Sequence, residues 1–168
     1  MRVITAPELY ARQDGDIFCF LAGGITNCPD WQKEVIKHLE GYGINNLVLF
    51  NPRREDFPIH DKSASCAQIY WEYRFLQQMD IFSMYFCNGE SDQPICMYEL
   101  GRNLVRFVDR ADRVVISVED GYKRAGDVVI QSSLALGCNT VHLHATPEEH
   151  ARLIREVSLN IMGTHKHP

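Results

Sequence analysis

Glu99 is the residue whose type and position first raise the question of chemistry. It lies in the segment QPICMYELGR, residues 93 to 102, near the start of a predicted helix. The helix dipole favours a carboxylate in the first turn, so this position has a purely structural explanation. Gly101 argues for more, because a glycine inside a helix costs about 1 kcal/mol relative to alanine and commonly permits close approach of a ligand or another backbone. Glu99 is therefore a candidate catalytic group.

A second acid, Glu72, lies in the segment CAQIYWEYRFLQQ, residues 66 to 78. Glutamate is rarely buried, so the ordinary expectation for Glu72 is an exposed position on a helix. Its neighbour Trp71 is a candidate substrate-binding residue, with a place in the core or at its rim as the alternative. Burial beside the Trp71 ring would raise the pKa of the Glu72 carboxyl group and suit it to donate a proton. Glu72 is therefore a second candidate, with the exposed position as the alternative.

Two pairs of basic residues could bind a small anion. Arg53 and Arg54 follow a predicted strand, and Lys123 and Arg124 follow another. A hydrogen bond from arginine to a phosphate contributes about 1.5 to 3 kcal/mol. Two acids directly follow Arg54, however, and an ordinary surface network of ion pairs explains the same run. The anion-binding reading and the surface reading both remain open.

The composition argues against several classes of function. A net charge of -5 weighs against a nucleic-acid polymer as partner, since duplex DNA usually demands a basic face. The six cysteines form no CxxC pair and the seven histidines are scattered, so no metal site is expected, and Cys19 and Cys87 are expected as reduced core thiols. Neither a dinucleotide-binding motif nor a P-loop motif occurs, and we expect no cofactor.

No segment predicts association with a membrane. The longest apolar runs, such as IFCFLAGGI at residues 17 to 25, are well short of the roughly 20 residues that a spanning helix needs. The N-terminal stretch MRVITAPELYARQDGD has no signal-peptide pattern. The expectation is a cytoplasmic protein with one domain, residues 1–168, long enough to form a single core.

Hydrophobic periodicity and turn residues predict five alternating strand and helix units. The predicted strands cover residues 16–22, 45–52, 79–87, 112–119 and 139–145. The predicted helices cover residues 30–43, 66–78, 94–108, 127–137 and 146–162, with Asp30, Asp127 and Thr146 as N-caps. This alternation predicts an α/β fold, a flavodoxin-like five-stranded parallel sheet with helices on both faces.

The predicted fold ranks the polar residues by their place along the strands. Ligands of open parallel sheets bind beyond the carboxyl ends of the strands, so Asp80 and Asp112, which begin strands, are expected to be structural. The residues expected at the ligand end are Gly23, Gly24, Ile25, Thr26 and Asn27, then Asn51, Arg53 and Arg54, then residues 88–93, which include Gln93, and residues 119–124. Glu99 opens the next helix and joins this set. The glycine pair alone is a weak signal, because it can serve only to form a turn.

Four blocks of sequence carry a resemblance to a known family. FLAGGITNCPDWQ, LVLFNPRRE, QIYWEYRFLQQMDI and PICMYELGR follow one another in an order and spacing that resemble the nucleoside 2-deoxyribosyltransferase-like family. The resemblance covers roughly residues 16 to 140. It implies a flavodoxin-like domain that cleaves the N-glycosidic bond of a nucleoside or nucleotide, and subunits that associate with copies of themselves.

The resemblance also implies roles for particular residues. The glutamate of the family's ELG motif attacks the anomeric carbon, and that role would fall on Glu99. Gly23 and Gly24 would lie against the ligand, and Glu72 matches an acid in the helix before the third predicted strand. Gln93 matches another family acid and is a departure, because an amide cannot serve as an acid there.

The chemistry of bond cleavage suits these residue types. Breaking a C1′–N bond builds positive charge on the sugar and negative charge on the leaving base, so it needs an anionic nucleophile and a proton donor, as in retaining glycosidases. Glu99 would form a glycosyl ester, and Glu72 would donate the proton or hold a sugar hydroxyl. Two alternatives remain open: a non-catalytic nucleotide sensor of the same fold, and a scaffold protein that binds no nucleotide.

Overall fold

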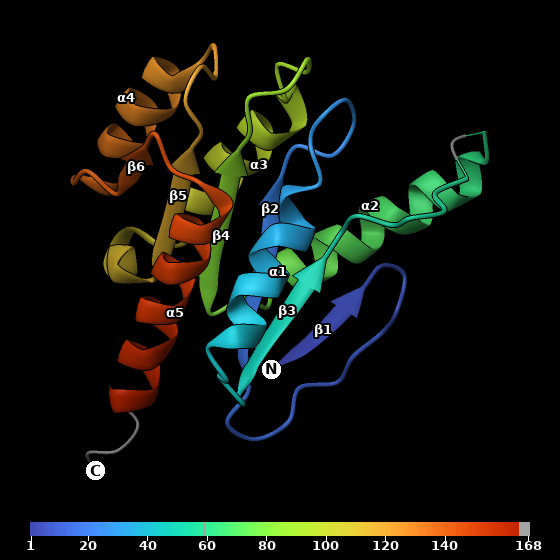
Figure 1. Ribbon diagram of the computed structural model, residues 1–168, viewed down its shortest axis with the longest axis horizontal. Helices are drawn as coiled ribbons and strands as arrows, with labels where there is room; N and C mark the ends of the chain where they lie inside the picture. Colours follow the sequence, from blue (N-terminus) through green and yellow to red (C-terminus); the bar gives the residue numbers. More distant parts are fainter. Residues whose placement is uncertain (59, 165–168) are drawn as a thin grey trace.

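Six parallel strands form the sheet of the computed structural model, which describes residues 1–58 and 60–164 (Figure 1). Their spatial order is β1-β3-β2-β4-β5-β6. The strands are β1 (Arg2–Thr5), β2 (Ile17–Gly23), β3 (Leu47–Asn51), β4 (Ile81–Phe86), β5 (Val114–Val118) and β6 (Val141–Leu143). The predicted α/β class and flavodoxin-like order are confirmed, with β1 as an additional strand beside β3.

Helices cover both faces of the sheet (Figure 1). One face packs against α1 (Trp31–Gly41) and α5 (Pro147–Thr164), and the other against α2 (Lys62–Leu76), α3 (Pro94–Leu104) and α4 (Ala125–Leu136). Successive residues of a strand point to opposite faces, so Cys19 and Leu21 of β2 join the first layer while Phe18 and Phe20 join the second. Two apolar clusters therefore hold the central strands, which are buried on both sides.

The sequence missed the first strand and misplaced several helix ends. Strand β1 has only four residues, too few to show a periodic pattern. Helix α2 begins at Lys62 rather than residue 66, because the Asp61 carboxylate accepts hydrogen bonds from the backbone N and the Oγ of Ser63. Helix α3 ends at Leu104 rather than 108, and a short 3₁₀ helix, η1 (Val108–Arg113), precedes β5.

The caps expected from sequence have mixed outcomes. Asp30 caps α1 by accepting a hydrogen bond from the Lys33 backbone N, and Thr146 and Glu149 cap α5 reciprocally. Asp127 was the wrong choice for α4: that helix begins at Ala125, and the Asp127 carboxylate instead pairs with Arg124 within the first turn.

Asp80 has the structural role expected at the amino end of the sheet. Its carboxylate accepts hydrogen bonds from the Phe18 backbone N at 2.8 Å and from Nη1 of Arg12 at 2.9 Å. Cys19 and Cys87 are buried free thiols, as expected. Within residues 1–58 and 60–164, no helix has the length and apolar character needed to span a bilayer.

His150 joins α5 to the middle of the sheet. Its ring is fully buried, with Nε2 at 2.8 Å from the hydroxyl of Ser83 on β4 and Nδ1 at 2.7 Å from the hydroxyl of Ser117 on β5. Burial lowers the pKa of this imidazole to about 3, because the charged form would lose its hydration. The native protein therefore holds His150 neutral at pH values where the unfolded chain protonates it.

This difference predicts acid sensitivity. Below the ordinary histidine pKa of about 6.5 the unfolded chain binds a proton that the native chain does not, so the free energy of unfolding decreases as the pH falls from there toward 3. The loss attributable to His150 is about 2 kcal/mol at pH 5. Urea unfolding should show a smaller decrease in the free energy of unfolding between pH 7 and pH 5 for His150→Gln than for wild type, whereas His60→Gln, which removes an exposed imidazole, should keep the wild-type decrease.

Candidate active site

A cavity of about 320 Å³ lies at the carboxyl ends of the central strands, between the loop after β2 and the start of α3. Its volume is at the lower end of the range for small-molecule sites. The lining residues are Phe20, Ala22, Gly23, Gly24, Ile25, Thr26, Pro52, Glu72, Ser91, Gln93, Pro94, Ile95, Cys96 and Glu99. They come from three strand ends and two helices, so the cavity is placed where an open parallel sheet binds ligands.

Most of the candidate residues meet in this cavity and some lie outside it. Those in the lining are Gly23, Gly24, Ile25, Glu72, Gln93 and Glu99. Asn51, Arg53, Trp71 and Arg124 do not belong to the lining. The rule that ligands bind at the carboxyl ends of strands placed Glu99 at this edge of the sheet, whereas Glu72 was assigned to the site only through the family resemblance.

Glu99 is half-buried in the cavity wall. Burial and the nearby Glu72 raise the pKa of its carboxyl group, Arg102 lowers it, and the net result is a pKa of about 7. The group therefore changes charge near neutral pH, where an ordinary glutamate is fully ionised. Such a shift at a cavity wall is typical of a functional carboxylate.

Glu72 lies in the same cavity and is held in place by its helix. Burial raises the pKa of its carboxyl group, and a hydrogen bond from Gln68 acts in the opposite direction. The Gln68 Nε2 donates to Oε1 of Glu72 at 2.8 Å and to the carbonyl of Pro52 at 2.8 Å. Gln68 was not singled out in the sequence, although its spacing of four residues from Glu72 places both on one helix face.

The two glycines after β2 are fixed by packing. A Cβ atom on Gly23 would lie 2.2 Å from the carbonyl oxygen of Tyr85 and 2.6 Å from the Trp31 ring, and its φ of +150° disfavours other residues. A Cβ atom on Gly24 would lie 2.4 Å from Sγ of Cys28 and 2.6 Å from Oε1 of Gln93. Glycine is therefore needed at both positions for contacts inside the protein, whether or not a ligand approaches.

Gln93 presents an unpaired oxygen at the cavity wall. Its side chain is buried, and its Nε2 donates to the carbonyl of Cys87 at 2.7 Å, which fixes the orientation of the amide. Oε1 has no hydrogen-bond partner among the described residues. A buried amide oxygen without a partner is costly, and a donor on a bound ligand would satisfy it.

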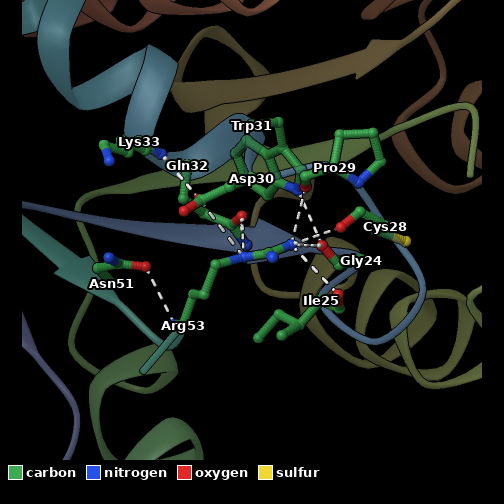
Figure 2. Close-up of polar contacts among 10 residues, drawn as sticks. All are labelled: Gly24, Ile25, Cys28, Pro29, Asp30, Trp31, Gln32, Lys33, Asn51 and Arg53. Atoms are coloured by element: carbon green, nitrogen blue, oxygen red, sulfur yellow. Dashed lines mark hydrogen bonds and ion pairs between the residues drawn. The ribbon is translucent and has the colours of Figure 1, made fainter. Parts of the chain in front are cut away.

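Arg53 lies beside the cavity but faces the loop after β2, and its contacts are described below (Figure 2). Asn51 accepts a hydrogen bond from the Arg53 backbone N at 3.0 Å and so shapes the turn after β3. Trp71 packs in the core against Phe20, Phe50 and Phe75. Its neighbours along α2 are not buried with it, since Tyr70 and Tyr73 are exposed and Glu72 is half-buried.

Arg124 is exposed and pairs with Asp127 at 2.9 Å. The sequence predicted close approach of another backbone or a ligand at Gly101, and no such approach occurs within the chain. A Cβ atom there would meet nothing within 4 Å, and the residue is exposed on the outer face of α3. No group of three or more potential metal ligands occurs in the part of the chain that the structure describes.

Several lining residues escaped the sequence reasoning. Phe20 and Ala22 read as ordinary strand residues, and Pro94, Ile95 and Cys96 read as the start of a helix. Their spacing carried a signal nonetheless, since Phe20, Ala22 and Gly24 alternate along β2 and share one face of the sheet. The face that carries Phe20 is the face that α2 and α3 cover, and both acids lie on those helices.

The arrangement can divide a reaction between two acids. Two carboxyl groups with raised pKa values share one largely apolar cavity, where one can be ionised while the other keeps its proton. An ionised carboxylate is a nucleophile, and a protonated one is a general acid. Retaining glycosidases use such a pair.

Comparison with known proteins gives one family. No curated protein matches the chain significantly. The family described as nucleoside 2-deoxyribosyltransferase like matches residues 17–122, which is more than half of the 168 residues. This range contains the complete lining of the cavity, and it confirms the resemblance seen in the sequence. The chain belongs to the nucleoside 2-deoxyribosyltransferase-like family.

Proposed function

We propose that this protein cleaves the N-glycosidic bond of a small nucleoside or nucleotide, with Glu99 as the nucleophile. The observation that carries the proposal is the placement of Glu72 and Glu99 in one cavity, with a pKa for Glu99 raised to about 7. Family membership supports glycosyl transfer in general. The cavity is large enough for a nucleoside but small for anything much larger.

In the first step an oxygen of the Glu99 carboxylate attacks C1′ of the sugar. The C1′–N bond breaks, its electron pair goes to the base nitrogen, and the proton of the Glu72 carboxyl group moves to the base. The product is a glycosyl ester on Glu99 and a free base. Burial raises the pKa of the Glu72 carboxyl group and so favours the protonated form that this role needs.

In the second step a water molecule or a second base attacks C1′ from the opposite side. The ester bond breaks, and Glu99 leaves as a carboxylate. Glu72, now ionised, accepts the proton that the attacking group gives up, so both acids return to their starting states. Water as acceptor makes the protein a hydrolase, and a base makes it a transferase.

Gln93 bears on both the substrate and the rival function. Its unpaired Oε1 suits a base that presents an N–H group, and its neutral amide cannot supply the proton. The loss of an acid at this position is the one observation that favours a non-catalytic nucleotide sensor. Incubation with a panel of nucleosides and their 5′-monophosphates, followed by chromatography for free base, separates the two: binding without base release identifies a sensor.

The outer face of α3 suits self-association. Tyr98 and Val105 on this face are each 66% exposed, and Tyr73 on α2 is 51% exposed, with the Arg102 guanidinium 5.2 Å from the Tyr73 ring centre. Gly101 lies between the two α3 residues with open space above it. Exposed apolar side chains around a helix glycine favour close approach of another helix, here in a second copy of the chain.

The first prediction concerns the nucleophile. Glu99→Gln keeps the shape of the side chain but cannot form the ester, so turnover should fall by about three orders of magnitude or more while nucleoside binding persists. Intact-protein mass spectrometry should show a glycosyl adduct on wild type, but not on the variant, after incubation with a slow 2-fluoro sugar analogue. Glu90→Gln, a change in an exposed acid of a nearby loop, should leave turnover and adduct formation unchanged. Near-normal turnover by Glu99→Gln would contradict the mechanism.

The second prediction concerns the coupling between the acids. The productive form of the pair carries one proton, so wild-type kcat/KM should pass through a maximum and fall near pH 7, where the pair loses its last proton from Glu99. Glu72→Gln removes a negative charge that raises the Glu99 pKa, so the variant should lose this fall and instead rise to a plateau through a pKa below 7, which burial keeps above the ordinary glutamate range. The same variant should lose more rate with a natural base than with an activated leaving group, which needs little protonation. If Glu72→Gln keeps the wild-type pH profile of kcat/KM and loses the same factor in rate with both kinds of leaving group, the role of Glu72 is only to hold the sugar.

The third prediction concerns self-association. Gly101→Leu has room within the chain and removes a helix glycine, so thermal stability should be kept or increased, but the added side chain should block a second copy. Light scattering after size exclusion should show an oligomer for wild type and a smaller species for the variant. Gly41→Leu is the matched control, because Gly41 also has open space but ends α1 on the opposite face of the sheet. A monomeric wild type would refute the interface.

A further inference from the structure

The guanidinium of Arg53 is directed at the loop after β2 (Figure 2). Its Nη2 lies within hydrogen-bond distance of four backbone carbonyls, those of Gly24 at 3.3 Å, Ile25 at 3.2 Å, Cys28 at 3.3 Å and Pro29 at 2.8 Å. Its Nε donates to Oε1 of Gln32 at 2.9 Å and lies 3.4 Å from a carboxylate oxygen of Asp30. One side chain from the end of β3 thus contacts the whole length of this loop.

The same loop forms one wall of the cavity. Gly24, Ile25 and Thr26 line it, while the carbonyls of Gly24 and Ile25 turn toward Arg53. The carbonyl of Gly24 also accepts a hydrogen bond from Nε1 of Trp31 at 2.9 Å. With its oxygens held on the Arg53 side, the loop presents its other surface to the cavity.

Close packing leaves this wall little room to move. Gly24 packs so closely against Gln93 and Cys28 that even a methyl group would lie under 3.0 Å from both. A small shift of the loop would therefore change the distance between Gly24 and the unpaired Oε1 of Gln93. The position of the loop thus affects the hydrogen bond that this oxygen can accept from a ligand.

We infer that Arg53 is a positioning residue, which sets the shape of the substrate-binding loop by collecting its carbonyls, and is not a ligand for a substrate phosphate. The inference rests on the proposed use of the cavity by a nucleoside. Its side chain is 17% exposed, and its Nε and Nη2 donors are directed at loop acceptors rather than at the cavity. Without the guanidinium, four carbonyls would lose a shared charged donor at once.

Lysine could not replace Arg53 in this role. The guanidinium donates in two directions from a rigid plane, toward Gln32 through Nε and toward the carbonyls through Nη2. A lysine ammonium is a single point at the end of a flexible chain and cannot occupy both places. Arg54 provides the contrast in the same segment, because its guanidinium lies 5.3 Å from the Phe57 ring centre.

The test compares Arg53→Lys, Arg53→Ala and the control Arg54→Ala. The first readout does not depend on activity: the indole N–H resonance of Trp31 in a ¹H–¹⁵N spectrum, which reports its bond to Gly24. It should move in both Arg53 variants and stay in place in Arg54→Ala, while the Trp71 indole resonance, whose N–H bonds to Glu8, stays in all three. Arg53→Lys keeps the comparison valid should Arg53→Ala fail to fold.

The second readout is ligand binding. The dissociation constants for 2′-deoxyadenosine and thymidine should rise about ten- to a hundredfold in the Arg53 variants. The factor should be equal for each nucleoside and its 5′-monophosphate, because the substitution disturbs the position of the loop and removes no phosphate contact. Added guanidinium ion should partly restore binding in Arg53→Ala and do nothing for Arg54→Ala. Loss confined to the monophosphates would overturn the inference in favour of phosphate recognition.

The two proposals fail separately. If wild type binds no nucleoside, the proposed function fails, and the Trp31 resonance still decides whether Arg53 holds the loop. If all variants bind nucleosides as wild type does, or if the Trp31 resonance is the same in Arg53→Ala and Arg54→Ala, the positioning role is refuted while the catalytic proposal stands.

Discussion

Burial of two carboxyl groups in one cavity is the constraint on which the rest of this structure depends. Desolvation raises the pKa values of both Glu72 and Glu99, and the Glu72 charge raises that of Glu99 as well. Such a pair does not favour folding, since apolar residues of similar size could be buried there with a smaller desolvation penalty. The chain holds the pair on two helices whose inner faces are anchored by Phe75 and Leu100 in a fully apolar cluster.

Rigid backbone contacts keep the cavity between these helices open. Gly23 lets β2 approach the carbonyl of Tyr85 on β4, which brings the loop after β2 close to the start of α3. Arg53 then holds that loop from the β3 side, and Gln93 opposes it from the α3 side. The wall nearest the acids is thus held by contacts from three neighbouring strands.

Period, strand order and the rule that ligands bind at carboxyl ends predicted the class of fold and the position of Glu99, whereas the place of Glu72 came only from the family resemblance. It could not assign Arg53, since the run NPRRED is compatible with a phosphate site, a surface network or a loop clamp, and only the direction of the guanidinium decides. Gly101 is a related case, because a glycine in a helix indicates close approach of another group but does not show whether that group belongs to the same chain. Strand β1 was missed because four residues show no period.

Because Gln93 stands where the family has an acid, proton transfer in the proposed reaction depends on Glu72 and Glu99. With an amide fixed by the carbonyl of Cys87, no acid remains at that wall, so in the proposed reaction the proton for the leaving base comes from Glu72. The productive state then has a single proton on the pair, carried by Glu72 and not by Glu99. Gln68 donates to Glu72 and so favours its ionised form, whereas burial favours the protonated form. The balance between these two effects, set within one turn of α2, decides how much of the protein is poised to react.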